Sequence, residues 1–393
     1  MSTVPTVGSR QYTDAFLHEL RSIGDPDADA AIAQFFDVEL DAPASGLMAA
    51  LIRHHPGSDE ASPALTAFLN EPMELPEWAD LERFRRGQDL FAEYLPQFGV
   101  ALWMASIPAG YAGARDVVVL ARAHELLSNP KRRFLETGQF LLDVMTHGSL
   151  EPGAKGLVDI RHVRLMHAAV RHMLTHESAE LGVDAWDHTS GLPINQMALL
   201  ATMFTFSVVG IESVVKFGVH LSDDEQDAYA HTWSVIASLM GVRHDLLPFD
   251  FADSQAVWKS IKRNEYASCQ EGVDLTRAAV EVMQKLIPGR FGDDVPSAGI
   301  RFLLGKDAAA LLGVGRANWT SGFFAPMHAF GGLMHRFERD FAPGRWATEW
   351  LGRTVMQTFI DGEWDGERLP RTTRRGDVAF EVPQQMRRRV GLE

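Results

Sequence analysis

Apolar residues recur every three to four positions along most of this chain, which is the spacing of the buried face of an α-helix. No alternation of apolar and polar residues, the pattern of a half-buried strand, extends over several segments. The sequence therefore predicts an all-α fold. We expect helices over residues 11–23, 26–37, 44–54, 79–95, 97–111, 114–128, 130–147, 159–174, 194–219, 223–240, 254–286 and 345–359.

Local signals mark several helix ends. Asp25 is placed to cap a helix that has Pro26 at its first position, where the missing N–H of proline is harmless. Ser222, followed three residues later by Glu225, forms a capping box at the start of another helix. Gly241 is expected to end that helix.

Two stretches are so apolar that they predict buried segments. Residues 97–111 contain Pro108 and Gly110, which predict a kinked segment that forms core or lines a pocket. Residues 197–211 fall short of the roughly 18 apolar residues of a membrane span. We therefore expect a buried core helix there, and no transmembrane segment.

The helix over 159–174 has an unusual face. At 3.6 residues per turn, one stripe collects apolar and basic residues: Ile160, Val163, Arg164, His167, Val170, Arg171 and Leu174. Four of the seven are apolar, so the stripe should point inward. Because buried charge is unfavourable without a partner, this face needs an acidic or metallic one. A haem would offer iron to His167 and propionates to an arginine.

Three interpretations of His167 compete. It is a core histidine whose ring nitrogens are hydrogen-bonded, a catalytic acid or base in a pocket, or an axial ligand of haem iron. The helix alone does not choose between the last two.

Composition limits the function classes. The chain has 393 residues, 46% of them apolar, and a net charge of −15. The acidic charge argues against a nucleic-acid binder and against docking by charge on an anionic membrane. Cys269 is the one cysteine, which excludes an intramolecular disulfide, a cysteine zinc site and haem attachment through paired cysteines.

The spacing Arg164-x-x-His167-x-x-x-Arg171 resembles the signature of the rubber oxygenase (latex clearing protein) and MpaB-type oxygenase family. The resemblance implies that His167 is the proximal ligand of a b-type haem. A second block, residues 131–144, also resembles the family. There Arg133 and Thr137 match its distal-side arginine and threonine.

This sequence departs from the family pattern at two positions. Where the family carries a lysine that closes the distal face of the iron, this chain has Glu136. The family's upstream glutamate, proposed as a base, has no counterpart; Val117 falls near its place, with Asp116 beside it. Rubber cleavage by the same distal machinery is therefore not implied. Glu136 is a candidate to replace the base or to close the iron.

By resemblance, the fold should be a globin-like helical core with additional helices at both ends. We expect one domain over 1–393, with a family-resembling core at about 75–285 and a helical extension with a charged tail at 286–393. The apolar stretch 297–334 would form core or wall a substrate channel.

The implied activity is that of a haem b-dependent oxygenase, an oxidoreductase that acts with O2 on an apolar organic substrate such as an isoprenoid or alkene. His167 would hold the iron. Arg164 and Arg171 would orient its helix or pair with propionates, and Arg133, Glu136 and Thr137 would tune the distal pocket. Two alternatives remain: a non-catalytic haem sensor or carrier, and a non-haem metal-dependent oxidase.

The start of the chain has neither the basic residues nor the apolar stretch of a secretory signal, so we expect a cytoplasmic protein with a small substrate. Monomer and homodimer both fit the composition.

Overall fold

The structure is a computed structural model. It describes residues 6–7, 10–38, 63–127, 130–176, 186–286, 294–315, 363–364 and 367–368. The helices expected at 44–54 and 345–359 lie outside these residues. So does the part of the apolar stretch 297–334 that follows residue 315.

The described chain is built from helices. Those of the first half are α1 (Asp14–Glu19), the 3-10 turn η1 (Leu20–Ser22), α2 (Pro26–Val38), α4 (Pro63–Asn70), α5 (Leu81–Glu93), α6 (Leu95–Ala101), the π-helix η2 (Leu102–Ser106), α7 (Ile107–Tyr111), α8 (Val117–Leu127), α9 (Pro130–Met145) and α10 (Lys155–His176).

The second half continues in the same way. It contains the 3-10 turn η3 (His188–Ser190), α11 (Gln196–Phe206), α12 (Val208–Lys216), α13 (Asp223–Leu239), the 3-10 turn η4 (His244–Leu246), α14 (Phe251–Glu265), α15 (Gln270–Leu286), α16 (Val295–Leu304) and α17 (Lys306–Leu311). Two antiparallel pairs of two-residue strands, β1 (Thr6–Val7) with β2 (Arg10–Gln11) and β3 (Glu363–Trp364) with β4 (Glu367–Arg368), complete the described elements. The all-α expectation is confirmed.

The predicted caps are present. The N–H of Ala28 donates to Asp25 Oδ1 (3.4 Å) at the start of α2. Both hydrogen bonds of the capping box between Ser222 and Glu225 open α13. Gly241, with φ of +87°, follows the end of α13, because glycine adopts this left-handed conformation without strain.

Several of the predicted helices are wrong as single elements; residues 11–23, for example, hold the end of β2, α1 and the turn η1. The segment 194–219 is divided at Ser207, whose hydroxyl (3.0 Å) and backbone N–H (2.9 Å) both donate to the carbonyl of Met203. The segment 254–286 is divided after Glu265, because Tyr266 is extended and pairs with Gly113 in an isolated β-bridge. A tertiary contact distant in sequence thus overrides the local periodicity.

The apolar stretch 97–111 is a helix interrupted by a π turn. The π-helix η2 is fully buried between α6 and α7, and Pro108 opens α7, where its missing N–H is tolerated. Such π turns are rare and occur frequently at functional sites. The predicted burial of this segment is confirmed, and its helix is interrupted by the π turn.

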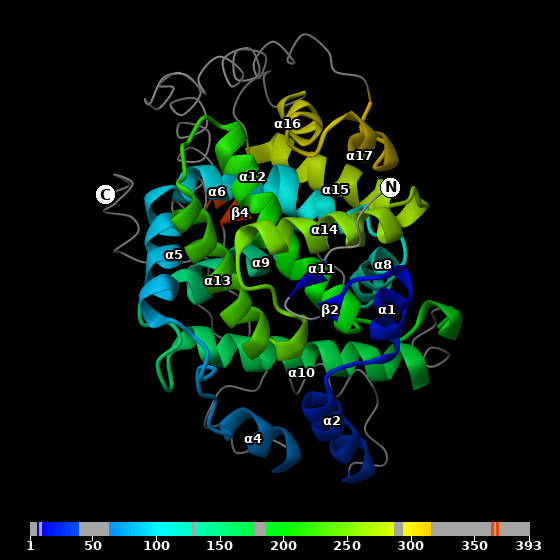
Figure 1. Ribbon diagram of the computed structural model, residues 1–393. Coiled ribbons are helices and arrows are strands. Elements are labelled where there is room, and N and C mark those ends of the chain that lie inside the picture. Colours follow the sequence, from blue (N-terminus) through cyan, green and yellow to red (C-terminus); the bar gives the residue numbers. More distant parts are fainter. Residues whose placement is uncertain are drawn as a thin grey trace.

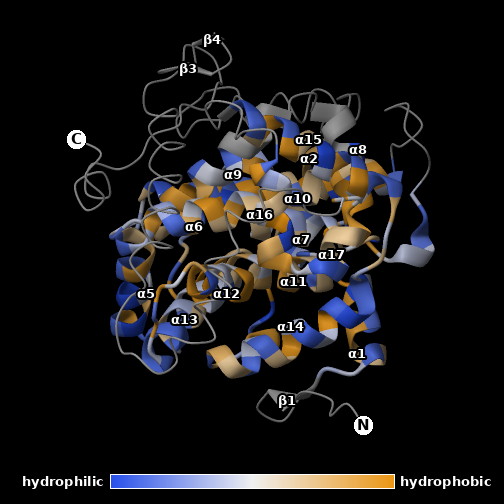
Figure 2. Cartoon of the chain, turned by 90° about the horizontal axis from the view of Figure 1, so that it is seen from above, coloured by the Kyte–Doolittle hydropathy of each residue, from blue (hydrophilic) through white to orange (hydrophobic). Residues whose placement is uncertain are grey.

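The long helix α10 separates two layers. In Figure 1 it crosses the lower part of the molecule, with α2 and α4 beneath it and the other labelled helices above. A large hydrophobic cluster fills the upper layer, and a smaller one joins α2 and α4 to α10. In Figure 2 hydrophobic residues colour much of α12, whereas the outward face of α5 is hydrophilic.

The segment Gln196–Lys216, which spans α11 and α12, is long and apolar enough to cross a membrane by length and composition. Its most apolar window is 72% buried inside the protein, as a core helix would be. This agrees with the core position expected from the sequence.

Candidate functional site

The helix α10 carries His167 at a break in its buried stripe. Ile160 is 0% exposed at one end of the stripe and Leu174 is 0% exposed at the other, with Val170 at 4%. Between them Val163 and His167 are only half-buried. The inward face expected from the sequence is therefore confirmed, but its centre is incompletely covered.

This break coincides with the boundary between the two hydrophobic clusters. Ile160 belongs to the large cluster, whereas Val170 and Leu174 belong to the smaller one. His167 lies within about 20° of Leu174 around the helix axis, so the two side chains leave α10 in similar directions. Leu165 and Met166, which precede His167, already pack in the smaller cluster, so the half-buried imidazole lies just past this boundary.

Arg164 and Arg171 both pair with carboxylates of α2. Arg164 donates from Nε to Asp25 Oδ2 (2.7 Å) and from Nη2 to Asp25 Oδ1 (2.8 Å). Arg171 donates from Nε to Asp29 Oδ1 (2.8 Å) and from Nη1 to the carbonyls of Pro193 (3.2 Å) and Ile194 (2.6 Å). We call Asp25–Arg164 and Asp29–Arg171 the α2–α10 ion pairs.

These pairs supply the acidic partner that the sequence required for the arginines. A bidentate guanidinium–carboxylate contact is among the stronger charge-assisted hydrogen bonds. Both guanidinium groups tie α10 to α2, and their pairing with propionates stays a prediction.

The distal block forms α9, which packs against α10. Glu136 and Thr137 are half-buried on α9. The backbone of Arg133 belongs to the same helix. Phe140, one turn further, packs against the large hydrophobic cluster. The residues expected on the distal side therefore share a helix that is adjacent to the helix of His167.

A polar cluster joins the end of α9 to the start of α10. Gln139 donates from Nε2 to Asp143 Oδ1 (2.8 Å), and Lys155 Nζ binds Asp143 Oδ2 and lies 3.6 Å from Asp159 Oδ2. The pKa of Asp159 is raised to about 7; burial is the largest cause, Lys155 opposes the shift, and the neighbouring Asp143 adds to it. The two helices are thus tied by a proton-sensitive contact.

The upstream position does not present an available base. Val117 is fully buried at the start of α8. Its neighbour Asp116 pairs with Arg21, whose Nη1 lies 3.2 Å from Asp116 Oδ1 and whose Nη2 binds Glu265. Burial raises the pKa of both carboxyl groups, and Arg21 opposes the shift in each case. Asp116 is committed to a structural ion cluster.

Other histidines occupy structural positions. His231 is 6% exposed, and its Nε2 accepts the N–H of Asp80 (3.0 Å), the cap of α5. The rings of His172 and His176 stack with centroids 4.6 Å apart. Across the part of the chain that the structure describes, no three His, Cys, Asp or Glu side chains gather where they could hold a metal ion. A multi-ligand metal centre would need residues outside that part.

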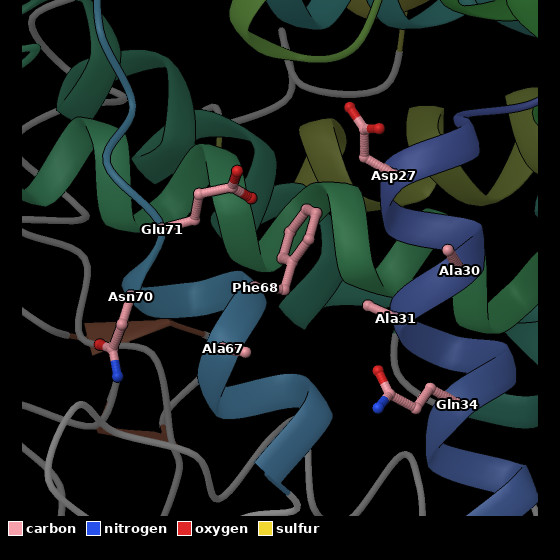
Figure 3. A pocket seen from close by; sticks show the side chains of 8 residues that line it. All are labelled: Asp27, Ala30, Ala31, Gln34, Ala67, Phe68, Asn70 and Glu71. Carbon is pink, nitrogen blue, oxygen red and sulfur yellow. The ribbon is translucent and has the colours of Figure 1, made fainter.

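A pocket of about 490 Å³ lies between α2 and α4. Figure 3 shows the ring of Phe68 rising from α4 toward the level of the Asp27 and Glu71 carboxylates, with the methyl group of Ala31 on α2 directed toward it. Its lining contains no histidine, cysteine, methionine or tyrosine, the side chains that hold haem iron. The pocket therefore does not coincide with the position of His167.

Sequence reasoning missed the partners of the arginines. Asp25 was recognised only as the cap of α2, and Asp29 lies 142 positions from Arg171 in the chain. The signal was present as alternate aspartates at 25, 27 and 29, but one sequence does not show which basic helix they face.

The comparisons with known proteins agree with this fold. Residues 85–336 match the family described as "ER-bound oxygenase mpaB/B'/Rubber oxygenase, catalytic domain". The rubber oxygenase of Streptomyces sp. (strain K30) is 24% identical over 308 residues, which are 75% of this chain and 71% of that protein.

The solved structure of latex clearing protein LCP in the closed state shares the fold. It aligns with a TM-score of 0.68 at 21% identity, over 91% of this chain and 95% of that one. The family match begins and ends later than the core expected at 75–285, and the division into core and extension stays a prediction. Because the family match spans well over half of the 393 residues, this chain belongs to the MpaB and rubber oxygenase family, and it is an oxidoreductase.

Proposed function

We propose that this protein is a haem b-dependent oxygenase that acts with O2 on an apolar organic substrate, an isoprenoid or alkene, with His167 as the proximal iron ligand. The observation that carries the proposal is the half-buried imidazole at the break in the α10 stripe. Neutral imidazole is a common axial ligand of haem iron. Membership of the oxygenase family and the relative named rubber oxygenase support an apolar substrate.

The residues present fit such a group. A single histidine is the donor set that a haem requires on its proximal side, and a planar apolar group would cover the exposed parts of Val163 and His167. The haem would supply the oxygen chemistry itself. The chain supplies the ligand, the polarity of the pocket and the exclusion of water.

On the opposite side, we assign pocket polarity to α9. The hydroxyl of Thr137 would donate a hydrogen bond to O2 or substrate in the pocket, and the positive charge of Arg133 would favour negative charge that develops there. Glu136 stands where the family has lysine. As a carboxylate it can accept a proton from substrate, which makes it the candidate base.

The test is haem content in two matched variants of α10. His167→Ala should abolish stoichiometric haem binding and leave the helical circular dichroism spectrum unchanged. His162→Ala is the control, because His162 is also half-buried and its Nδ1 already bonds the carbonyl of Val158 (2.9 Å). Normal haem content in His167→Ala would overturn the ligand assignment.

The alternatives give different results. Haem-free protein that contains stoichiometric iron or manganese would identify a non-haem oxidase. Protein that holds one haem per chain but turns over neither alkenes nor polyisoprenoids would identify a haem sensor or carrier.

A further inference from the structure

We infer that Asp25 and Asp29 of α2 are positioning residues for His167, acting through the α2–α10 ion pairs. This inference rests on the proposed function, because it concerns how the iron ligand is held. The helix α2, which carries both aspartates, begins at Pro26, 59 residues before the family match begins at residue 85. The inferred role therefore extends the oxygenase site to a helix outside the matched segment.

The ion pairs bracket the histidine. Arg164 is one turn before His167 and Arg171 is one turn after it, and the two arginines lie within about 20° of each other around α10. His167 is about 40–60° from that line. Contacts at two points on one line fix both the rotation of the helix and its position along its axis, and therefore the direction in which the imidazole leaves it.

The ion pairs are buried well enough to hold the helix. The side chain of Arg164 is 13% exposed and that of Asp25 is 5% exposed. The side chain of Arg171 is 5% exposed and that of Asp29 is 36% exposed. Loss of Asp29 leaves the largely buried guanidinium of Arg171 without its carboxylate, and loss of Asp25 leaves Arg164 only the exposed Asp27 at 3.6 Å; both changes are unfavourable.

Two glycines make room for the pairs. A Cβ at Gly24 would lie 2.5 Å from Asp29 Oδ2 and 2.8 Å from Arg171 Nε. A Cβ at Gly241 would lie 2.6 Å from Asp25 Oδ2. Any side chain at either position would displace an ion pair, so each pair occupies a space that the backbone provides.

The buried side-chain amide of Gln196 is hydrogen-bonded to the backbone of both glycines. Gln196 is 0% exposed, and its Nε2 donates to the carbonyls of Gly24 (2.9 Å) and Gly241 (2.8 Å). Its Oε1 accepts the N–H of Arg243 (2.9 Å). The loops that flank the two ion pairs are therefore held to each other and to the start of α11.

Positioning of His167 by the aspartates and propionate binding by the arginines predict opposite effects of removing an aspartate. If Arg164 or Arg171 served a haem propionate, removal of the competing aspartate would free the guanidinium and strengthen haem retention. If the aspartates position α10, the same removal would weaken retention, as changes behind a metal ligand commonly do by about 10-fold or more.

The experiment measures haem loss from the intact holoprotein to excess apomyoglobin for Asp25→Asn, Asp29→Asn and Asp27→Asn. Asparagine preserves the size of the side chain and removes its charge. Asp27 is the matched control, because it lies on the same helix, is 80% exposed and is 3.6 Å from Arg164 Nη2. We expect about 10-fold faster loss from the Asp25 and Asp29 variants, a shifted ferric absorption spectrum, and wild-type behaviour from Asp27→Asn.

Equal or slower haem loss from both Asp25→Asn and Asp29→Asn would overturn the inference and favour propionate binding. A wild-type protein that takes up no haem would overturn the proposed function, and the inference with it.

A second measurement separates positioning from general destabilisation. Amide hydrogen exchange of the haem-free variants should accelerate in α10 around His167 and remain unchanged in α13. Uniform acceleration across all helices would show a merely structural role and would overturn the inference.

Discussion

The carboxyl groups of Asp143 on α9 and Asp159 on α10 share one cation, Lys155, whose Nζ binds Asp143 Oδ2 and lies 3.6 Å from Asp159 Oδ2. Burial favours the neutral form of Asp159, Lys155 favours its charged form, and the neighbouring carboxyl group of Asp143 adds to the rise of its pKa. The contact joins the helix of Glu136 and Thr137 to the helix of His167. Its protonation state therefore bears on how the two sides of the site are held together.

This contact predicts a pH dependence of stability. The pKa of Asp159 is raised from 3.8 to about 7, so between these values the folded state binds a proton that the unfolded state has lost. Stability from this group is fully present below the unfolded pKa and declines as the pH rises through about 7.

The difference in Tm between Asp159→Asn and the wild type isolates the effect. Asparagine stays neutral, so we expect the variant to gain stability relative to the wild type as the pH rises from 5 to 8. A pH-independent difference in Tm would contradict the assignment.

A second pH dependence has the opposite sign. Burial lowers the pKa of His231 below 6.5, and its Nε2 accepts the N–H of Asp80. The stabilisation is present above the unfolded pKa and is lost as the pH falls through the folded pKa. His231→Gln keeps a hydrogen-bond acceptor without a titrating ring, so its Tm should fall less than that of the wild type between pH 7.5 and 5. An equal fall in both proteins would refute this role.

The buried ion cluster around Arg21 should contribute more to the free energy of unfolding than ion pairs on the surface do. The side chains of Arg21 and Glu265 are 3% and 4% exposed, and Arg21→Met would leave Glu265 buried without its cation. We expect a loss of about 3–5 kcal/mol in the free energy of unfolding, measured by denaturant titration. Arg21→Met with Glu265→Gln should recover part of it.

The matched control is Arg263→Met, whose ion pair with Asp14 is exposed to solvent on both sides. Exposed pairs contribute little because water screens them. A loss from Arg263→Met as large as that from Arg21→Met would contradict the argument from burial.

The close approach of α5 and α13 depends on Gly87. A Cβ there would lie 2.1 Å from Thr232 Oγ1 and 2.8 Å from the carbonyl of Ala228. Gly87→Ala should therefore destabilise the protein by about 1–3 kcal/mol.

Gly210→Ala in α12 is its control. The nearest atom to a Cβ there is Phe98 Cε1 at 3.6 Å, an ordinary contact, so the better helix propensity of alanine should add about 0.5–1 kcal/mol. Denaturant midpoints of the two variants on the same side of the wild type would contradict the packing argument.

The sequence predicted the helices whose ends carry local signals. The capping box of Ser222, the cap at Asp25 and the stop at Gly241 are all confirmed. The predictions that were wrong depended on distant contacts. Tyr266 interrupts a helix because it pairs with Gly113, which lies 153 positions before it in the chain.

The candidate site likewise depends on contacts between residues that are distant in the sequence. Periodicity placed Arg164, His167 and Arg171 on one face of a helix, and that face is largely buried. Periodicity could not show that α2 supplies the carboxylates, because residues 25 and 164 come together only in the folded chain. The roles of Arg133, Glu136 and Thr137 stay predictions.

The visible absorption spectrum of the purified protein, before and after dithionite, with pyridine haemochrome quantitation, tests the central claim most directly. If the protein binds haem b as proposed, we expect a strong haem band and about one non-covalent b-type haem per chain. A colourless protein that also fails to take up added haemin would contradict it.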